Sequence, residues 1–121
     1  MPDFDWPRPV VAFQIQARDR DKQEAFYREM FDWDITRDAA IPVSLIPPGK
    51  GPPVEGVGGV LVQNERSAFA VFIQVADLGE SMKKAEELGG KSIFGPIDVP
   101  GGPTIAQIED PEGNLVGLVQ M

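Results

Sequence analysis

The residues in this sequence that could perform chemistry are carboxylates, lysines and a single tyrosine, because histidine and cysteine are both absent. The absence of cysteine excludes disulfides, thiolate metal sites and cysteine nucleophiles. The absence of histidine removes the commonest general base near neutral pH and the commonest metal ligand. An enzyme would therefore need Asp, Glu, Tyr or Lys as its acid or base. Glu55, Asp98 and Glu109 are the only loosely placed candidates, and they form no recognisable catalytic group.

The charge balance restricts the possible partners. Eleven basic and nineteen acidic residues give a net charge of -8. This balance argues against nucleic acid, because phosphate contacts require basic patches. Solubility is the simplest reason for the acidity, and attraction of a cationic ligand is the functional alternative. We see no signal peptide and no apolar run near the roughly 18 residues of a membrane span, so we expect a cytoplasmic protein that does not bind membranes.

A pattern that occurs twice predicts how the chain is organised. Residues 12–35 (AFQIQARDRDKQEAFYREMFDWDI) align without a gap on residues 70–93 (AVFIQVADLGESMKKAEELGGKSI). Each segment is typical of a strand, a turn containing Asp, a helix and a second strand, and further β-rich runs follow in both halves. We therefore predict one α+β domain over residues 1–121, built from two tandem βαβββ modules at about 10–64 and 69–121.

Helical periodicity predicts which face of each helix is buried. In the second helix, Asp77 and Glu80 have the spacing of a capping box, and the two glycines at 89 and 90 end the helix. Its expected apolar face is Leu78, Met82, Ala85 and Leu88. The first helix is expected at about residues 21–31. Its predicted buried stripe is Phe26, Tyr27 and Met30, with Lys22, Glu24, Arg28 and Glu29 mostly outside.

Three motifs carry a resemblance to a known family. They are EAFYREMFDWDI after the first strand, VADLGESMKKAEELGG after the fifth, and the closing DPEGNLVGLVQ, whose first five residues also suit a hairpin turn. With the doubled βαβββ module, they resemble the vicinal oxygen chelate superfamily of glyoxalase I, bleomycin-resistance proteins and extradiol dioxygenases, over about residues 10–120. The resemblance implies a curved, cup-like mixed sheet with helices on its outer face, a ligand or metal in the cup, and a homodimer.

The resemblance also locates the positions at which metal-using members carry their ligands. These are a histidine or glutamine in the first strand of a module and a glutamate in its last strand. In this sequence they fall on Ala12, Ala70 and Gly117, with a looser match at Gly59. None of these side chains has a donor atom, whereas a divalent ion needs several converging oxygen or nitrogen ligands. We therefore predict no metal and no other cofactor, and we expect Gly117 to leave open space.

Strand alternation extends this set to a predicted ligand-binding face. Its members point into the expected cup, where ligand pockets combine apolar surface with a few polar groups; they are Ala12, Gln14, Gln16, Gly59, Ala70, Phe72, Gln74, Leu115, Gly117 and Val119. The opposite face is almost wholly apolar and is expected beneath the helices; it comprises Phe13, Ile15, Val71, Ile73, Val75, Val116 and Leu118. Hydration, or hydrogen bonding between strands of a dimer, is an equally good reason for the glutamines.

Three functions remain open from the sequence. The favoured one is a metal-independent protein that binds a small cationic or aromatic molecule in the cup or at a dimer interface. The second is a glyoxalase- or dioxygenase-type enzyme, a lyase or oxidoreductase with a non-standard site, although fold alone does not imply function and no catalytic residues are identified. The third is a protein-interaction module, for which the Pro-rich loop at 47–53 offers a contact surface.

Overall fold

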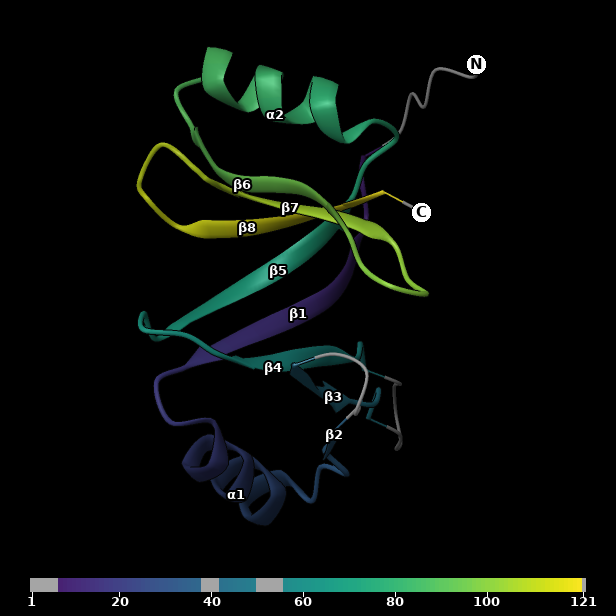
Figure 1. Cartoon of the computed structure of the whole chain (residues 1–121), viewed down its shortest axis with the longest axis vertical. Coiled ribbons are helices and arrows are strands. Elements are labelled where there is room, and N and C mark those ends of the chain that lie inside the picture. Colours follow the sequence, from purple (N-terminus) through teal and green to yellow (C-terminus); the bar gives the residue numbers. More distant parts are fainter. Residues whose placement is uncertain (1–6, 38–41, 50–55, 121) are drawn as a thin grey trace. The chain divides into compact units, whose positions relative to one another are not determined.

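The computed structural model describes residues 7–37, 42–49 and 56–120 (Figure 1). They form two compact units. The first unit comprises residues 12–69, and the second comprises residues 70–120 together with the segment that ends at Val11. The predicted loop at 47–53 lies largely outside the described residues, as does Glu55.

The first unit is a four-stranded mixed sheet with one helix. Its elements are β1 (Val10–Ala17), α1 (Arg20–Phe31), β2 (Thr36–Arg37), β3 (Val43–Ile46) and β4 (Gly59–Gln63), the first of which begins in the segment before residue 12. The strand order is β2-β3-β4-β1. The β2–β3 and β3–β4 pairs are antiparallel, whereas β1 and β4 are parallel.

The second unit repeats this arrangement. Its elements are β5 (Ala68–Gln74), α2 (Leu78–Glu87), β6 (Lys91–Asp98), β7 (Thr104–Glu109) and β8 (Leu115–Gln120), in the strand order β5-β8-β7-β6. Again the first and last strands pair in parallel and the other pairs are antiparallel. Two tandem βαβββ modules of mixed sheet are therefore present, and the predicted α+β class is confirmed.

Local sequence explains where each helix begins. The Asp19 carboxylate accepts a hydrogen bond from the backbone N–H of Lys22 at 3.1 Å, and the Asp77 carboxylate accepts one from that of Glu80 at 2.9 Å. Each bond satisfies one of the N–H groups that a first helical turn leaves without a partner. After α2 the chain turns at Gly89, where φ is 96°, a left-handed conformation that favours glycine. The predicted cap at Asp77 and the stop after the helix are both confirmed.

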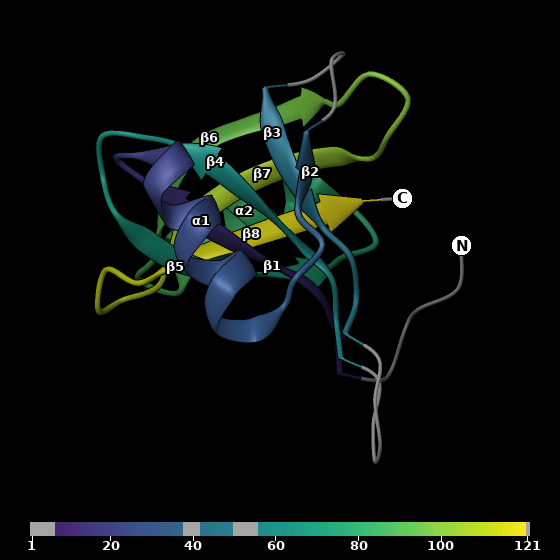
Figure 2. The same ribbon diagram turned by 90° about the horizontal axis from the view of Figure 1, so that it is seen from below.

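Each unit has its own apolar core between its sheet and its helix. In the first unit the buried core residues are Ile15, Ala17, Ile35, Ile46 and Leu61. In the second they are Leu78, Ala106 and Leu118, with Ile73, Val75 and Val116 packed against them. Figure 2 shows α1 lying across its sheet from a second direction. The predicted helix-facing set is correct for Phe13, Ile15, Ile73, Val75, Val116 and Leu118. It is wrong for Val71, which is 40 % exposed.

The predicted buried stripe of α1 is correct for Tyr27, which is partly buried and packs against the core, but wrong for Phe26 and Met30. Phe26 is 55 % exposed and Met30 is 61 % exposed, whereas Glu24, expected outside, is only 3 % exposed. Glu24 lies about 160° around the helix from Phe26 and about 120° from Met30, because successive residues rotate by about 100°. Its charged partners, described below, make the burial of this carboxylate possible. At the end of α2, Leu88 is also exposed rather than packed.

The closing hairpin matches its prediction. The backbone N–H of Asp110 donates to the carbonyl of Asn114 at 2.9 Å, which closes the turn between β7 and β8. The Asp110 carboxylate accepts hydrogen bonds from the backbone N–H groups of Glu112 and Asn114, both at 2.9 Å. Gly113 has a φ of 85°, as the turn requires. Neither of the two described helices is long and apolar enough to cross a membrane.

Candidate functional site

The second unit places the predicted binding residues on the face of its sheet that points away from α2. In β5 and β8 these residues alternate with the core residues beneath α2, so they lie on the other face; they are Ala70, Phe72, Gln74, Leu115, Gly117 and Val119. Phe72 and Gly117 are direct partners in the parallel pairing of the two strands. This face is mainly apolar, and it includes the aromatic ring of Phe72 on β5.

The expected open space at Gly117 is absent. A Cβ atom added to Gly117 would lie 2.5 Å from Cδ1 and 2.6 Å from Cε1 of Phe72. These distances are far below van der Waals contact, so the ring of Phe72 already occupies the volume into which a side chain at 117 would project. Phe72 is only 8 % exposed. The glycine is required because a neighbouring phenyl ring lies against its backbone.

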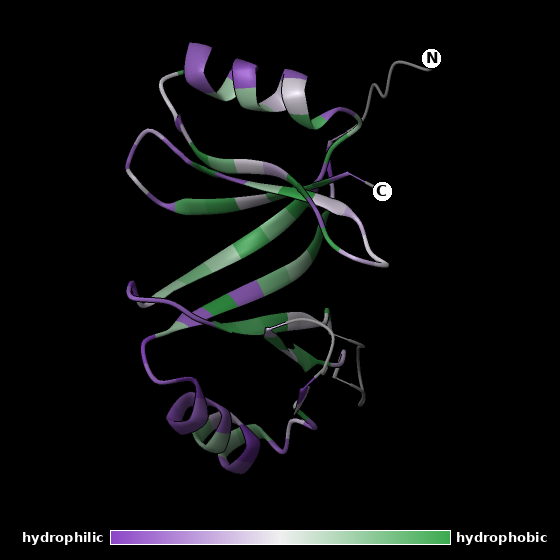
Figure 3. Cartoon of the chain, viewed as in Figure 1, coloured by the Kyte–Doolittle hydropathy of each residue, from purple (hydrophilic) through white to green (hydrophobic). Residues whose placement is uncertain are grey.

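The first unit carries a connected series of side-chain amides on the face of its sheet that points away from α1. Gln14 and Gln16 are buried neighbours on β1, and Nε2 of Gln16 donates to Oε1 of Gln14 at 3.0 Å. Nδ2 of Asn64 then donates to Oε1 of Gln16 at 3.0 Å. We call Gln14, Gln16 and Asn64 the amide series. Figure 3 shows the resulting hydrophilic bands within the otherwise mainly hydrophobic β1.

Gly59 does not lie on this face. It pairs with Phe13, and a Cβ atom added to Gly59 would lie 2.8 Å from Cδ1 of the Phe13 ring. Phe13 packs against the core beneath α1, so Gly59 belongs to the face nearest the helix. The residue that pairs with Gln14 is Val60. The loose sequence alignment was therefore one residue out of register, which moves a side chain to the opposite face of a sheet.

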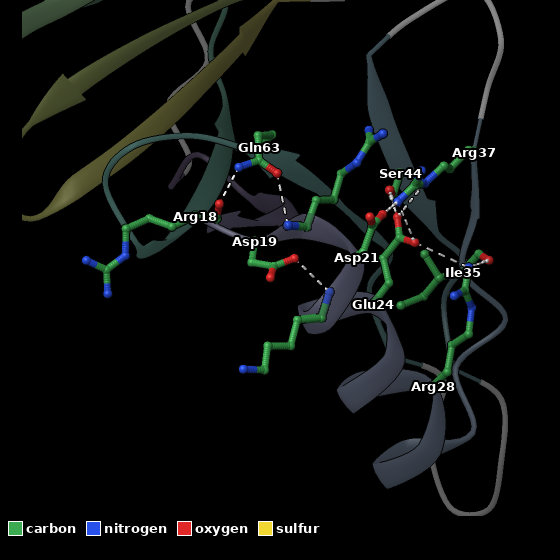
Figure 4. A network of polar contacts seen from close by, with 11 residues as sticks. Arg18, Asp19, Asp21, Glu24, Arg28, Ile35, Arg37, Ser44 and Gln63 are labelled. Carbon is green, nitrogen blue, oxygen red and sulfur yellow. Dashed lines mark hydrogen bonds and ion pairs between the residues drawn. The ribbon is translucent and has the colours of Figure 1, made fainter.

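An open depression adjoins the amide series. It has a volume of about 550 Å³ and is lined by Arg18, Gln63, Asn64 and Glu65. Oε1 of Gln63 accepts from the backbone N–H of Arg20 at 2.9 Å, and its Nε2 donates to the carbonyl of Arg18 (Figure 4). Asn64 both lines the depression and bonds to Gln16. The only sequence signal for this feature was the polar run after the apolar strand, which we did not single out.

The residues at the expected metal positions do not fit a metal ion. Ala12, Ala70 and Gly117 supply no donor atom, and Val60 supplies none in the first unit. Within residues 7–37, 42–49 and 56–120, no three acidic, histidine or cysteine residues come together to hold an ion. Of the loosely placed acids, Asp98 accepts a hydrogen bond from Oγ1 of Thr104 at 2.8 Å. The described residues therefore assemble no ligand set.

The family follows from the sequence together with this architecture. Residues 11–119, nearly the whole chain, match the glyoxalase-like domain family. The chain belongs to that family. The resemblance to the glyoxalase, bleomycin-resistance and dioxygenase superfamily, which rested on three motifs and a repeat, is thereby confirmed. No match is found among curated proteins.

Solved structures show the same fold as this glyoxalase-like chain. A glyoxalase/bleomycin resistance protein/dioxygenase superfamily member from Vibrio splendidus 12B01 is 12% identical, with a TM-score of 0.63 over 95% of this chain and 100% of that chain. A methylmalonyl-CoA epimerase in complex with methylmalonyl-CoA and NH4+ is 15% identical, with a TM-score of 0.60 over 93% and 94%. Methylmalonyl-CoA epimerase from Mycobacterium tuberculosis is 14% identical, with a TM-score of 0.56 over 92% and 86%.

The glyoxalase-like chain also holds a buried carboxylate in a dense set of polar contacts (Figure 4). Oε2 of Glu24 accepts from Nε of Arg37 at 3.0 Å and also from the hydroxyl of Ser44. Oε1 of Glu24 accepts from Nη2 of Arg37 at 3.1 Å, which makes the contact bidentate. Arg37 also pairs with Asp21, and Arg28 donates to the carbonyl of Ile35 at 2.8 Å.

These contacts set the protonation state of Glu24. Burial raises its pKa, but the hydrogen bonds from Arg37 and Ser44 and the positive charges of Arg37 and Arg28 outweigh burial, so the pKa lies below its ordinary value of 4.5. The hydrogen bond to Glu24 in turn raises the pKa of Arg37. A carboxylate held ionised in this way is a poor proton acceptor near neutral pH. Its role is to fix α1 to the β2–β3 hairpin.

Proposed function

We propose that this chain is a metal-independent small-molecule-binding protein of the glyoxalase/bleomycin-resistance/dioxygenase superfamily. The observation that carries the proposal is the contact between Phe72 and Gly117. In the superfamily pattern this position of the last strand bears a carboxylate that holds a metal ion. Here the adjacent ring of Phe72 fills the volume that such a side chain would occupy. A Gly117→Glu substitution would therefore require Phe72 to move. The residues around Gly117 on this face are aromatic or aliphatic and buried: Phe72, Ala70, Leu115 and Val119.

The amide series supports binding of a polar ligand in the first unit. Each amide carries both donors and an acceptor, so it recognises a polar group without carrying a charge or transferring a proton. The adjoining depression adds the Arg18 guanidinium and the Glu65 carboxylate, neither of which forms an ion pair within the described part of the chain. With a net charge of -8, the preferred ligand is an organic cation or a planar aromatic compound.

We also propose that the functional form is a cytoplasmic homodimer, with the ligand held on the faces opposite the helices or at the dimer interface. Support for the dimer comes from the superfamily resemblance. Sedimentation velocity over a range of concentrations measures the subunit number. A monomer at every concentration would contradict the dimer and leave the ligand-binding proposal in place.

An enzyme remains the alternative because two of the similar structures are methylmalonyl-CoA epimerases. An acid–base reaction needs a carboxylate or similar group with a free lone pair facing the substrate. Both oxygens of Glu24 are engaged by Arg37 and Ser44. One oxygen of Asp98 accepts a hydrogen bond from Thr104. The neutral amide series on the candidate face cannot replace such a base.

The binding proposal is tested by isothermal titration with planar cationic dyes such as ethidium and acridine orange, in buffer containing EDTA. We expect saturable binding that EDTA leaves unchanged. Replacing Gln16→Leu, which removes the central amide, and Phe72→Leu, which removes the ring, should each weaken binding by about tenfold, the loss of one good contact. Gln23→Leu on α1 is the control and should bind as the unmodified chain does. Absence of binding across the dyes, or binding abolished by EDTA, would contradict the proposal.

A further inference from the structure

The outer face of α1 is an exposed apolar surface. Phe26 is 55 % exposed, Met30 61 % and Phe31 51 %. Phe26 and Met30 are four residues apart and so lie together on the helix, and Phe31 follows at its C-terminal end. We call these three residues, with Tyr27 and Trp33, the α1 aromatic surface. Grouped exposed apolar residues of this kind mark interaction sites more often than isolated ones do.

The rings of this surface are held in place by one another. Tyr27 stacks on Trp33 with 5.1 Å between ring centroids and 9° between planes. Phe26 meets Tyr27 edge to face at 5.2 Å, and Phe31 lies 5.5 Å from Trp33. Trp33 is anchored in turn by Phe13, at 5.7 Å, which packs against the core of the first unit. Because the rings are already ordered, a partner would lose little side-chain entropy on binding here.

Acidic side chains flank the α1 aromatic surface. Glu29, Asp32 and Asp34 are exposed, and none of them forms an ion pair with residues of the described chain. Arg28, on the same helix as Glu29, is directed to Glu24 and the Ile35 carbonyl instead. Lys22 lies in the first turn of the helix, two turns from Phe31. The surface therefore combines exposed rings with uncompensated negative charge.

We propose that the α1 aromatic surface binds a cationic amphipathic segment of a partner protein. Apolar side chains of such a segment would cover Phe26, Met30 and Phe31, while its lysines or arginines would meet Glu29, Asp32 and Asp34 and the ring faces. A second copy of this chain is a poorer occupant, because a two-fold symmetric contact would bring the same carboxylates against each other. This role is separate from the small-molecule site, which lies on the other face of the sheet.

The test uses two short amphipathic helical peptides that differ only in charge, one of leucine and lysine and the other of leucine and glutamate. Binding is followed by fluorescence anisotropy of the labelled peptide. We expect the lysine peptide to bind and the glutamate peptide not to bind. The double variant Phe26→Ser/Met30→Ser should weaken binding by tenfold or more, as loss of central apolar contacts does. Glu29→Gln/Asp32→Asn/Asp34→Asn should weaken binding and reduce its dependence on salt.

Leu88→Ser is the matched control, because Leu88 is an equally exposed apolar residue at the end of the other helix. It should bind the lysine peptide as the unmodified chain does. Equal binding by the Phe26→Ser/Met30→Ser variant would overturn the proposal and show that the peptide responds to net charge alone. A dimer in sedimentation velocity that dissociates in this double variant, but not in Leu88→Ser, would also overturn it, because the surface would then be covered by a second copy.

Discussion

The contact between Phe72 and Gly117 defines what is distinctive about this chain at the scale of single residues. In a strand, glycine is normally a disadvantage because it packs nothing and loses backbone entropy on folding. Here the volume that a side chain at 117 would occupy is filled by the ring of Phe72, the residue paired with it. The sequence shows that the side chain at 117 has no donor atom. It could not indicate that the volume is filled, because that depends on which rotamer a neighbouring strand's phenylalanine adopts.

Gly117→Ala should therefore destabilise the protein. The added methyl group must displace the Phe72 ring, and overpacking of this kind should lower the free energy of unfolding by about 1–2 kcal/mol. Urea unfolding followed by circular dichroism measures the change. In a Phe72→Leu background the same substitution should cost much less, because the ring is gone. An equal cost in both backgrounds would show that the ring is not the obstacle.

Gly79→Ala provides the matched glycine control. A Cβ atom at Gly79 meets only Oδ1 of Asp77, at an ordinary contact distance of 3.5 Å. Because alanine favours the helix over glycine, this change should raise the free energy of unfolding by up to about 1 kcal/mol. A loss of stability here would mean that glycine substitutions are harmful for reasons other than packing.

Glu24→Gln should remove part of the acid sensitivity of the fold. At neutral pH the loss of the charged bidentate contact to Arg37 should lower the free energy of unfolding by about 2 kcal/mol. The pKa of Glu24 is lower in the folded chain than its ordinary 4.5, so the folded state binds fewer protons than the unfolded state as pH falls. The stability that Glu24 contributes is thus complete above about pH 4.5 and is lost as the pH falls through its folded pKa.

The measurement is urea unfolding of both proteins at neutral pH and at several values below 4.5. The difference in stability between them should shrink as the pH falls. The variant should retain some pH dependence, because the hydrogen bond from Arg37 also lowers the pKa of Asp21, and hydrogen bonds from Asn114 lower that of Asp110. A constant difference at every pH would contradict the role assigned to Glu24.

At the scale of elements, the helix caps were the most predictable feature. Asp77→Ala removes the acceptor for the Glu80 N–H and should cost about 1 kcal/mol of unfolding free energy. Asp77→Asn keeps an acceptor in the same place and should cost only a few tenths. Urea unfolding distinguishes them. If asparagine cost as much as alanine, the charge rather than the cap hydrogen bond would be the important property.

The order of elements was also predictable, whereas the orientation of α1 and the position of Gly59 were not. Strand alternation and helix caps are local properties, and they can be read from neighbouring residues. Glu24 faces inward because Arg37 and Ser44, more than ten residues later, supply its partners. The register of Gly59 depends on a long connection between β3 and β4 whose length no local rule fixes. Likewise Arg18 and Asn64 are distant in the sequence, and only the folded structure brings them to the same depression.

Across the whole molecule, the chemistry of particular side chains says more about function than the fold does. Solved structures with the same fold include methylmalonyl-CoA epimerases, so the fold itself leaves the function open. The distinguishing features are side chains: an amide series, a phenyl ring in place of a metal-binding volume, and an acidic aromatic surface on α1. On these features we base the proposals that the chain binds organic cations without a metal ion and that α1 binds a cationic partner.

The central claim, metal-independent binding of a small molecule, is tested most directly by native mass spectrometry of protein purified without chelators. We expect chains that carry no stoichiometric divalent ion. We also expect a planar cationic dye such as acridine orange to add its mass to the chain equally with and without EDTA. One tightly held divalent ion per site, with dye binding lost when the ion is removed, would contradict the account and return the chain to the metal-dependent members of its superfamily.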